Sequence, residues 1–252
     1  MASSFSSPIH SQIEFYCLCY NNPTIAAEMN TRFGNMGIHI NIYGGVQHSD
    51  PRIASVLPDQ HKGATRTWSM LYGHLDMIEQ FYNTGKPYGI FCEDDIVVRT
   101  DLADHLPNII QDFDKMKLDI LLLGYLSVYP IHDLGDNYRQ ALSETTDPAA
   151  FYKYYTYPHD LWGTQSYMLS HDHAKTIVET YGREYALKTL TDSSLAPFSS
   201  DWTITKTGKS ALIYPMFCIE NGKQAFEHFG HWGQYHFHLN AFKNNYIEGR
   251  FA

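Results

Sequence analysis

Apolar runs alternate with segments of helical periodicity along most of the chain. Continuous or alternating apolar runs predict strands, whereas apolar positions repeated about every 3.6 residues predict one buried face of a helix. The expected strands cover residues 13–20, 38–43, 88–92, 118–126, 162–169 and 211–219. The expected helices cover residues 24–33, 64–82, 102–116 and 171–181, with Ser170 as the amino-terminal cap of the last one.

The order of these elements predicts an α/β protein. A strand, a helix and a second strand open the chain, which is the usual start of a nucleotide-binding layer. We therefore expect a mixed, mostly parallel sheet of the Rossmann-like kind, flanked by helices, in a single domain of 252 residues. Residues 1–12 precede the first strand and are expected to form a flexible amino terminus, and residues 127–160 form a long loop.

The composition limits the partners of the chain. Its formal net charge is −9 and no basic run interrupts it, so a nucleic-acid partner is excluded. No apolar stretch has the length of a transmembrane segment, and the amino terminus lacks the features of a signal peptide. The four cysteines show no zinc-type spacing, and Cys17, Cys19 and Cys92 lie in apolar, strand-like runs, which indicates that these three are reduced core residues. We expect a cytoplasmic protein, in the host cytoplasm if the chain is viral.

Three consecutive acids, Glu93-Asp94-Asp95, directly follow the expected strand 88–92. Like charges this close raise one another's pKa and resist burial unless a cation compensates them. A divalent ion takes carboxylates and substrate phosphates as ligands, and the ligands of α/β sheets collect at the carboxyl ends of strands. The alternative is a solvated acidic turn before a helix that begins at Asp101. The preceding apolar strand favours a metal-dependent site.

The residues around this acidic triplet resemble a known enzyme family. They are similar to glycosyltransferase family 25, which includes lipopolysaccharide galactosyltransferases and collagen β-galactosyltransferases. The matching segments are residues 63–74, 89–96 (GIFCEDDI), 163–179, 197–202 (PFSSDW) and 214–215. Together they extend the resemblance over roughly residues 13–220.

The resemblance implies a GT-A fold, a nucleotide-diphosphate sugar as donor, expected to be a UDP-sugar, Mn²⁺ or Mg²⁺ as cofactor, and inversion at the anomeric carbon. Residues 13–126 would then form the nucleotide-sugar-binding half, and residues 127–252 the half that binds a glycan or glycoprotein acceptor. The turn Asn21-Asn22-Pro23 and residues 44–61 depart from the family pattern. This departure leaves the base and the sugar of the donor open.

The donor side of such a site would contain residues from three parts of the chain. The roles are Asp95 as metal ligand, Glu93 and Asp94 on the donor ribose or the waters of the metal, Asn21 and Asn22 beside the nucleotide, and Lys62 and Arg66 either on the diphosphate or on the surface.

Asp201 is the candidate catalytic residue on the acceptor side. An inverting transfer needs a carboxylate that takes the proton of the attacking hydroxyl, and Asp201 precedes Trp202, which would stack on a sugar. Asp201 is alternatively the cap of a helix through Thr205, and the two roles are compatible. Tyr125, Trp162 and Trp232 either line the acceptor groove or pack in the core.

Four of the 14 histidines lie in the carboxy-terminal tail: His228, His231, His236 and His238. Neutral imidazole suits Mn²⁺, and GT-A enzymes often use a carboxy-terminal histidine as a further metal ligand. His228 and His231 directly follow the last expected strand and are the preferred candidates. A structural role is the alternative for each of them.

Two other functions remain open. A metal-dependent phosphoester hydrolase would use the same triplet, although such sites usually draw carboxylates and histidines from several strands to hold two metals. A non-catalytic module on the same scaffold would bind sugars without turnover.

Overall fold

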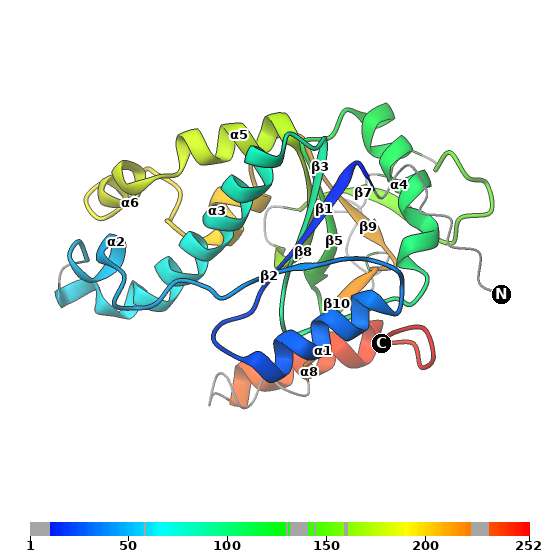
Figure 1. Cartoon of the computed structure of the whole chain (residues 1–252), viewed down its shortest axis with the longest axis horizontal. Helices are drawn as coiled ribbons and strands as arrows, with labels where there is room; N and C mark the ends of the chain where they lie inside the picture. Colours follow the sequence, from blue (N-terminus) through cyan, green and yellow to red (C-terminus); the bar gives the residue numbers. More distant parts are fainter. Residues whose placement is uncertain are drawn as a thin grey trace.

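Eight strands form one sheet in the part of the chain that the structure describes (Figure 1). The structure is a computed structural model that describes residues 11–57, 59–129, 131, 141–143, 145–158, 161–222 and 232–252. The strands are β1 (Ile13–Leu18), β2 (Asn41–Tyr43), β3 (Tyr88–Glu93), β5 (Ile120–Leu126), β6 (Ala141–Ser143), β7 (Lys153–Thr156), β8 (Trp162–Ser170) and β9 (Ser210–Tyr214). Their order in the sheet is β2-β1-β3-β8-β5-β9-β7-β6.

Most strands of this sheet run in one direction, and only β8 and β7 run against it. β1 is parallel to β2 and β3, and β9 is parallel to β5. β8 lies antiparallel between β3 and β5, and β7 lies antiparallel between β9 and β6. A separate pair joins β4 (Ile96–Val98) to β10 (Cys218–Glu220) in antiparallel orientation. The expected mixed, mostly parallel, Rossmann-like sheet in one domain is confirmed.

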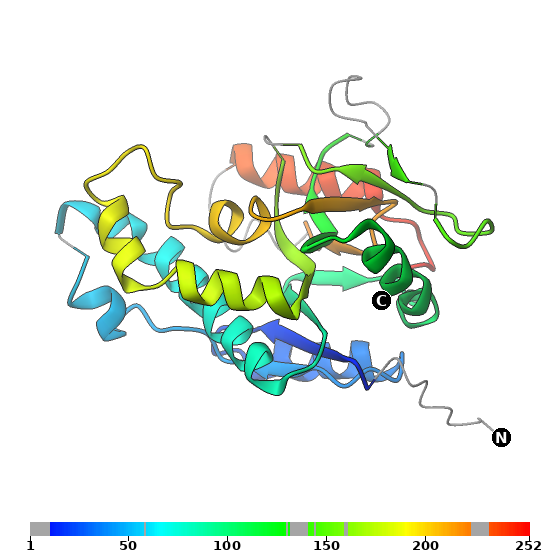
Figure 2. The ribbon, with the colours of Figure 1, turned by 90° about the horizontal axis from the view of Figure 1, so that it is seen from above.

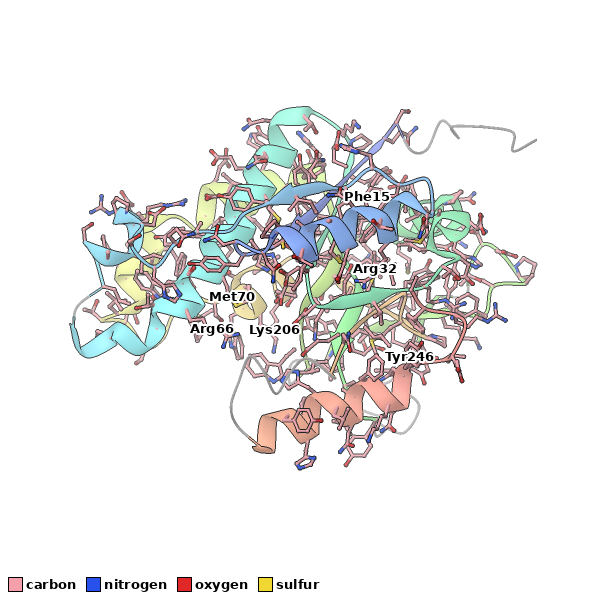
Figure 3. All side chains as sticks on the ribbon, turned by 60° about the horizontal axis from the view of Figure 1, so that its bottom comes forward. Phe15, Arg32, Arg66, Met70, Lys206 and Tyr246 are labelled. Carbon is pink, nitrogen blue, oxygen red and sulfur yellow. The ribbon has the colours of Figure 1, made fainter. Side chains whose placement is uncertain are left out.

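Helices cover both faces of the sheet (Figures 1 and 2). The helical elements are α1 (Pro23–Gly34), α2 (Pro51–Ala54), η1 (Asp59–Ala64), α3 (Thr65–Thr84), α4 (Leu102–Met116), α5 (His171–Thr180), α6 (Arg183–Thr189), the π-helical turn η4 (Asp201–Thr205) and α8 (Trp232–Asn245). α1 and α4 pack on one face, and α3 and α5 pack on the other. The guanidinium of Arg32 donates to the carbonyl oxygen of Ile96, which ties α1 to β4 (Figure 3).

Strand β1 shows how the sequence builds both cores. Phe15 and Cys17 belong to the core under α1 and α4, whereas Tyr16 and Leu18 belong to the core under α3 and α5. Successive side chains of a strand point to opposite faces, so a strand buried on both faces must be apolar at every position. This is why the inner strands of the sheet could be recognised as continuous apolar runs.

Two chain segments extend beyond the sheet on the same side of the molecule, at the left of Figures 1 and 2. One contains α2, η1 and the start of α3, and the other contains α6. Trp68 and Tyr72 of α3 each lie 5.1 Å from the ring centroid of Phe198 in edge-to-face geometry. These aromatic contacts hold the first segment against the residues that follow α6.

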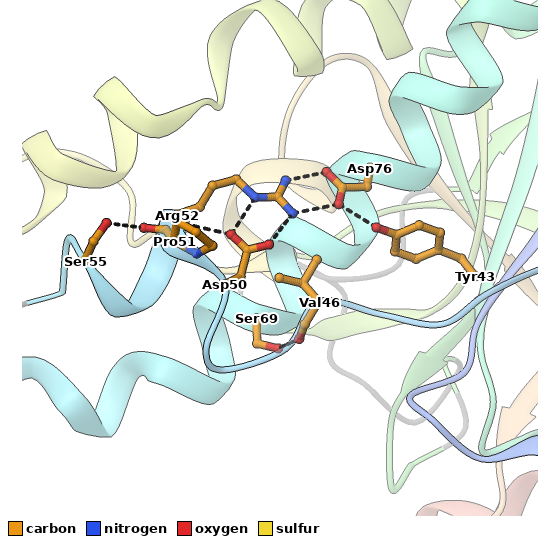
Figure 4. A network of polar contacts seen from close by, with 8 residues as sticks. All are labelled: Tyr43, Val46, Asp50, Pro51, Arg52, Ser55, Ser69 and Asp76. Atoms are coloured by element: carbon orange, nitrogen blue, oxygen red, sulfur yellow. Dashed lines mark hydrogen bonds and ion pairs between the residues drawn. The ribbon is translucent and has the colours of Figure 1, made fainter.

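A polar network fixes α2 to α3 and to the end of β2 (Figure 4). The Arg52 guanidinium binds the Asp76 carboxylate at 2.6 and 2.9 Å and also binds Asp50. The hydroxyl of Tyr43 donates to Asp76 at 2.6 Å. Residues 44–61, which depart from the family pattern, therefore contain α2 and the start of η1, and charge-assisted bonds hold α2 in place.

The sequence predicted several boundaries correctly. α4 covers the expected residues 102–116, and the hydroxyl of Ser170 accepts a hydrogen bond from the His173 N–H at 3.2 Å, as expected of the cap of α5. Among the described residues, no helix is both long and apolar enough to cross a membrane. Residues 1–10 of the expected flexible amino terminus lie outside the described residues.

Two expectations about strands are wrong. The strand expected over residues 211–219 is two strands, because β9 ends at Tyr214 and β10 begins at Cys218. Pro215 lies between them, and its nitrogen has no hydrogen to donate to a ladder. The segment 127–160, expected to lack regular structure, contains β6 and β7 at the edge of the sheet.

The close approach of β5 to β10 gives a first test of the fold. A Cβ on Gly124 would collide with the backbone carbonyl oxygen of Cys218. Gly124→Ala should therefore lower the free energy of unfolding by about 1–3 kcal/mol, because backbone must move to admit the methyl group. Urea denaturation measures the loss.

Gly34→Ala is the matched control, since a Cβ on Gly34 meets no atom within 4 Å. Gly34 ends α1, and alanine there should leave stability unchanged or raise it by up to about 1 kcal/mol. Equal effects of the two substitutions would contradict the packing of β5 against β10.

Candidate active site

The acidic triplet lies at the carboxyl edge shared by β1 and β3. Leu18, the last residue of β1, pairs with Glu93, the last residue of β3. Burial, and next the hydrogen bond and charge of Asp94, raise the pKa of the Cys19 thiol to about 12. The end of β1 therefore lies directly beside the triplet, as the parallel arrangement of the two strands requires.

The two asparagines predicted beside the nucleotide follow β1 at this same edge. Asn22 caps α1, and its side-chain oxygen accepts a hydrogen bond from the Ile25 N–H at 3.2 Å. Asn21 adopts a positive φ of 48°, in the left-handed region that asparagine occupies more readily than most residues. Both residues lie at the edge of the sheet where the triplet lies, and their contact with a nucleotide stays a prediction. The side-chain oxygen of Asn22 already has a structural partner.

Glu93 is a partly buried carboxylate that three groups compensate. The hydroxyl of Thr164 donates to Glu93 Oε1 at 2.8 Å, and His74 Nε2 lies 3.4 Å from the same oxygen. His74 Nε2 is within ion-pair distance of Glu93, but it makes no aligned hydrogen bond to a described residue. Burial alone would raise the pKa of Glu93, but His74, Thr164 and Arg66 together lower it below its usual range. Glu93 is therefore ionised at neutral pH.

Asp201 is held by strand β8 rather than by its own helical turn. Its Oδ1 accepts a hydrogen bond from the backbone N–H of Gly163 at 2.8 Å. The expected capping role is wrong, because Asp201 is the first residue inside the π-helical turn and no side chain caps that turn. Burial raises the pKa of Asp201, the Gly163 N–H opposes the rise, and the charge of Glu93 adds to it.

The start of β8 brings these two acids together. Gly163 holds Asp201, and the next residue, Thr164, holds Glu93. The hydroxyl of Thr164 also lies 3.3 Å from the hydroxyl of Ser200, the residue before Asp201. Neighbouring hydrogen bonds at the start of β8 thus hold both the acid that ends β3 and the acid that opens η4.

Asp95 has no comparable compensation. Its Oδ1 is buried and has no hydrogen-bond partner among the described residues. Burial, followed by the charges of Glu220, Glu93 and Asp94, raises its pKa well above the usual range. β10 brings Glu220 to this position, and the N–H of Asn221 donates to the Asp95 carbonyl oxygen at 2.6 Å.

A divalent cation fits the surroundings of Asp95. An ion there would provide the missing partner of Oδ1 and reduce the repulsion between the neighbouring carboxylates. Within the described residues, no group of three or more His, Cys, Asp or Glu side chains is arranged to hold a metal ion. An ion that shares its coordination with substrate phosphates needs only one or two protein carboxylates. Asp95 is the residue that would hold it.

A histidine of the tail other than the two preferred candidates lies beside the site. His228 and His231 lie outside the described residues, as do the side chains of Lys62 and Trp232. His238 of α8 lies with its Nδ1 2.6 Å from Glu220 Oε1. The carboxy-terminal helix thus contributes a histidine next to the carboxylate that faces Asp95.

The aromatic candidates differ in exposure. Tyr125 is buried and packs behind Gly163, whose added Cβ would lie 2.8 Å from Tyr125 Cβ, so core packing is its role. Trp162 has 43% of its surface exposed. The positive charge of Arg66 lowers the pKa of Glu93.

Several residues of the site escaped the sequence interpretation. They are His74, Thr164, Ser200, Lys206 and Glu220. Glu220 directly follows the apolar run 211–219, as Glu93 follows the run 88–92, and this position was a usable signal. The contacts of His74 and Thr164 with Glu93 join segments that are far apart in the chain, so no local sequence pattern predicts these contacts.

Comparisons with known proteins add little to this geometry. A scan against models of protein families found no match, and a search of curated proteins also found none. Among solved structures, the crystal structure of A197 from STIV matches with a TM-score of 0.40 and 10% sequence identity, covering 80% of this chain and 81% of that chain. A TM-score of this size carries no conclusion about fold or function.

Proposed function

We propose that this protein is a metal-dependent glycosyltransferase that moves a sugar, with inversion, from a nucleotide diphosphate to a hydroxyl of a glycan or glycoprotein. One observation carries the proposal. Glu93 and Asp201 are far apart in sequence, yet consecutive residues hold them at the carboxyl edge of a Rossmann-like sheet. Thr164 binds Glu93, and Gly163 binds Asp201. In an inverting transfer, Asp201 would take the proton of the acceptor hydroxyl, and Glu93 would bind the donor beside it.

The donor side comprises the ends of β1 and β3. Glu93 is ionised and fixed by Thr164, so it can accept hydrogen bonds from the hydroxyls of the nucleotide ribose. Arg66 provides positive charge on the same side. A divalent cation held by Asp95 would neutralise the charge that develops on the leaving diphosphate. The donor is expected to be a UDP-sugar, and Mn²⁺ or Mg²⁺ the cation.

Asp201 acts on the acceptor side as general base. The acceptor oxygen attacks the anomeric carbon opposite the diphosphate, the hydroxyl proton passes to the Asp201 carboxylate, and the diphosphate leaves with the electrons of the broken bond. Its raised pKa makes Asp201 a stronger base than an ordinary aspartate, and the Gly163 N–H keeps the carboxylate oriented.

The donor and the cation should stabilise the protein together. With each ligand at about 100 times its dissociation constant, binding adds about 2.7 kcal/mol, or roughly 5–10 °C in melting temperature. Mn²⁺ with a UDP-sugar should shift the melting temperature more than the sum of the separate shifts, because the diphosphate completes the coordination of the ion. Thermal denaturation with UDP-glucose, UDP-galactose, UDP-xylose and GDP-sugars measures the effect.

Asp95→Asn should remove this joint shift, since it removes the charge that attracts the ion. Asp172→Asn is the control, because the Asp172 side chain is fully exposed on α5. A joint shift that survives Asp95→Asn would refute the assignment of Asp95. Rapid phosphate release from generic esters without an acceptor would instead support a phosphoester hydrolase.

Asp201→Asn should lower the rate of transfer by about 10²- to 10⁴-fold, the usual contribution of a general base. Donor binding should survive, because Asp201 lies on the acceptor side. Radiolabelled transfer to a glycan and calorimetric titration with the donor separate the two effects. Unchanged transfer together with unchanged sugar binding would indicate a non-catalytic binding module.

The same variant should be at least as stable as the wild type at neutral pH. The pKa of Asp201 is raised in the folded state. In the unfolded chain the Asp201 carboxyl therefore loses its proton at a lower pH, about 3.9. As the pH rises from there through the raised pKa, the wild type loses stability relative to Asp201→Asn, which does not titrate. Urea titrations at several pH values measure the difference in free energy of unfolding between the variant and the wild type. A difference in favour of the variant that shrinks as pH rises would contradict the raised pKa.

A further inference from the structure

The ammonium group of Lys206 lies in a corner formed by two tryptophan rings. Its Nζ is 4.5 Å from the ring centroid of Trp162 and 4.3 Å from that of Trp202. The two rings meet edge to face, with centroids 5.6 Å apart and planes at 80°. Attraction between the cation and the ring faces holds the ammonium in one place, so little entropy is lost when it binds a further group.

Trp162 is exposed although it is a large aromatic residue. It is the first residue of β8, and 43% of its surface is accessible. A ring that served only to hold Lys206 could be buried at lower cost, because exposed apolar surface is unfavourable. The exposed indole is a flat apolar surface of the kind on which the C–H face of a sugar ring packs.

The same short segments hold the candidate base. Trp162 precedes Gly163, whose N–H binds Asp201, and Trp202 follows Asp201. The hydroxyl of Tyr157 donates to the Leu161 carbonyl oxygen at 2.9 Å and lies 3.3 Å from Thr205 Oγ1. This tyrosine fixes the start of β8 to the end of η4, and so fixes Trp162 relative to Lys206.

The charge of the whole protein makes a local cation significant. With a formal net charge of −9, the protein as a whole repels anionic ligands. Asp201 and Glu93 add negative charge beside the acceptor position. An anionic acceptor can therefore bind there only if a cation is placed to receive it, and Lys206 has that position.

We propose that Trp162 and Lys206 form an acceptor subsite for a sugar that carries a negative charge, either a carboxylate or a phosphate. The indole packs against the sugar ring, the ammonium pairs with the anionic group, and the hydroxyl to be modified faces Asp201. This inference rests on the proposed function, because it takes Asp201 as the base of the transfer.

Binding is tested without donor or metal, so that it does not depend on turnover. The probes are methyl glucoside, methyl glucuronoside and methyl glucoside 6-phosphate, titrated while tryptophan fluorescence is recorded. The wild type should bind at least one of the two anionic probes about tenfold more tightly than the neutral one, the size expected of one charge-assisted hydrogen bond. The tighter of the two identifies the carboxylate or the phosphate as the natural group.

Two variants assign the effect to residues. Lys206→Met keeps the aliphatic stem between the rings and should abolish the preference for an anion, whereas Lys188→Met, at an exposed position of α6, should preserve it. Trp162→Ala should weaken the binding of all three probes about tenfold. Trp162→Phe should weaken it less, because phenylalanine keeps a ring face. Circular dichroism and melting temperature check that each variant is folded.

Equal binding of charged and neutral probes by the wild type, or no binding of any probe, would overturn the subsite. So would a preference that survives Lys206→Met. A protein that prefers the anionic probe through Lys206 but transfers no sugar would support the subsite while removing the proposed transfer. Sugar transfer without any anion preference would remove only the subsite.

Discussion

The start of strand β8 is the part of the structure on which the candidate site depends. A Cβ on Gly163 would lie 2.8 Å from Tyr125 Cβ, so only glycine lets β8 approach β5 this closely. At that place the Gly163 N–H holds Asp201, and the Thr164 hydroxyl holds Glu93. Two consecutive residues thus fix the distance between acids that come from opposite halves of the chain. A larger residue at position 163 would disturb the sheet and the site together.

The three central acids differ in how far their burial is compensated, and this difference suits them to different proposed roles. Glu93 has a hydroxyl donor, a histidine and an arginine nearby, and its pKa is lowered. Asp201 has a single backbone donor, and its pKa is raised. Asp95 has an oxygen without a partner among the described residues and the most negative surroundings. A compensated carboxylate suits binding, a partly compensated one suits proton transfer, and an uncompensated one suits a cation.

The sequence predicted the sheet well because its inner strands are buried on both faces. Strands β3 and β5 are apolar at nearly every position, and α4 has a regular apolar face, so local patterns suffice. The strands β4 and β10 are only three residues long, too short for a pattern to predict their pairing, yet they bring Glu220 to Asp95. From the sequence, Asp201 could be the cap of a helix through Thr205. The Gly163 N–H, distant in sequence, binds its carboxylate instead, and tertiary contact prevailed over local preference.

The antiparallel direction of β8 explains why neighbouring residues can hold both Glu93 and Asp201. In a parallel sheet every strand would bring only its carboxyl end to the ligand edge. β8 runs against β3, with Cys92 paired to Ser166, so it begins where β3 ends. The residues that open β8 therefore lie beside the acids that close β3. A shift of this register by one residue would separate Gly163 from Asp201 and Thr164 from Glu93, and the buried side chains on both faces of β8, such as Tyr167 and Met168, oppose that shift.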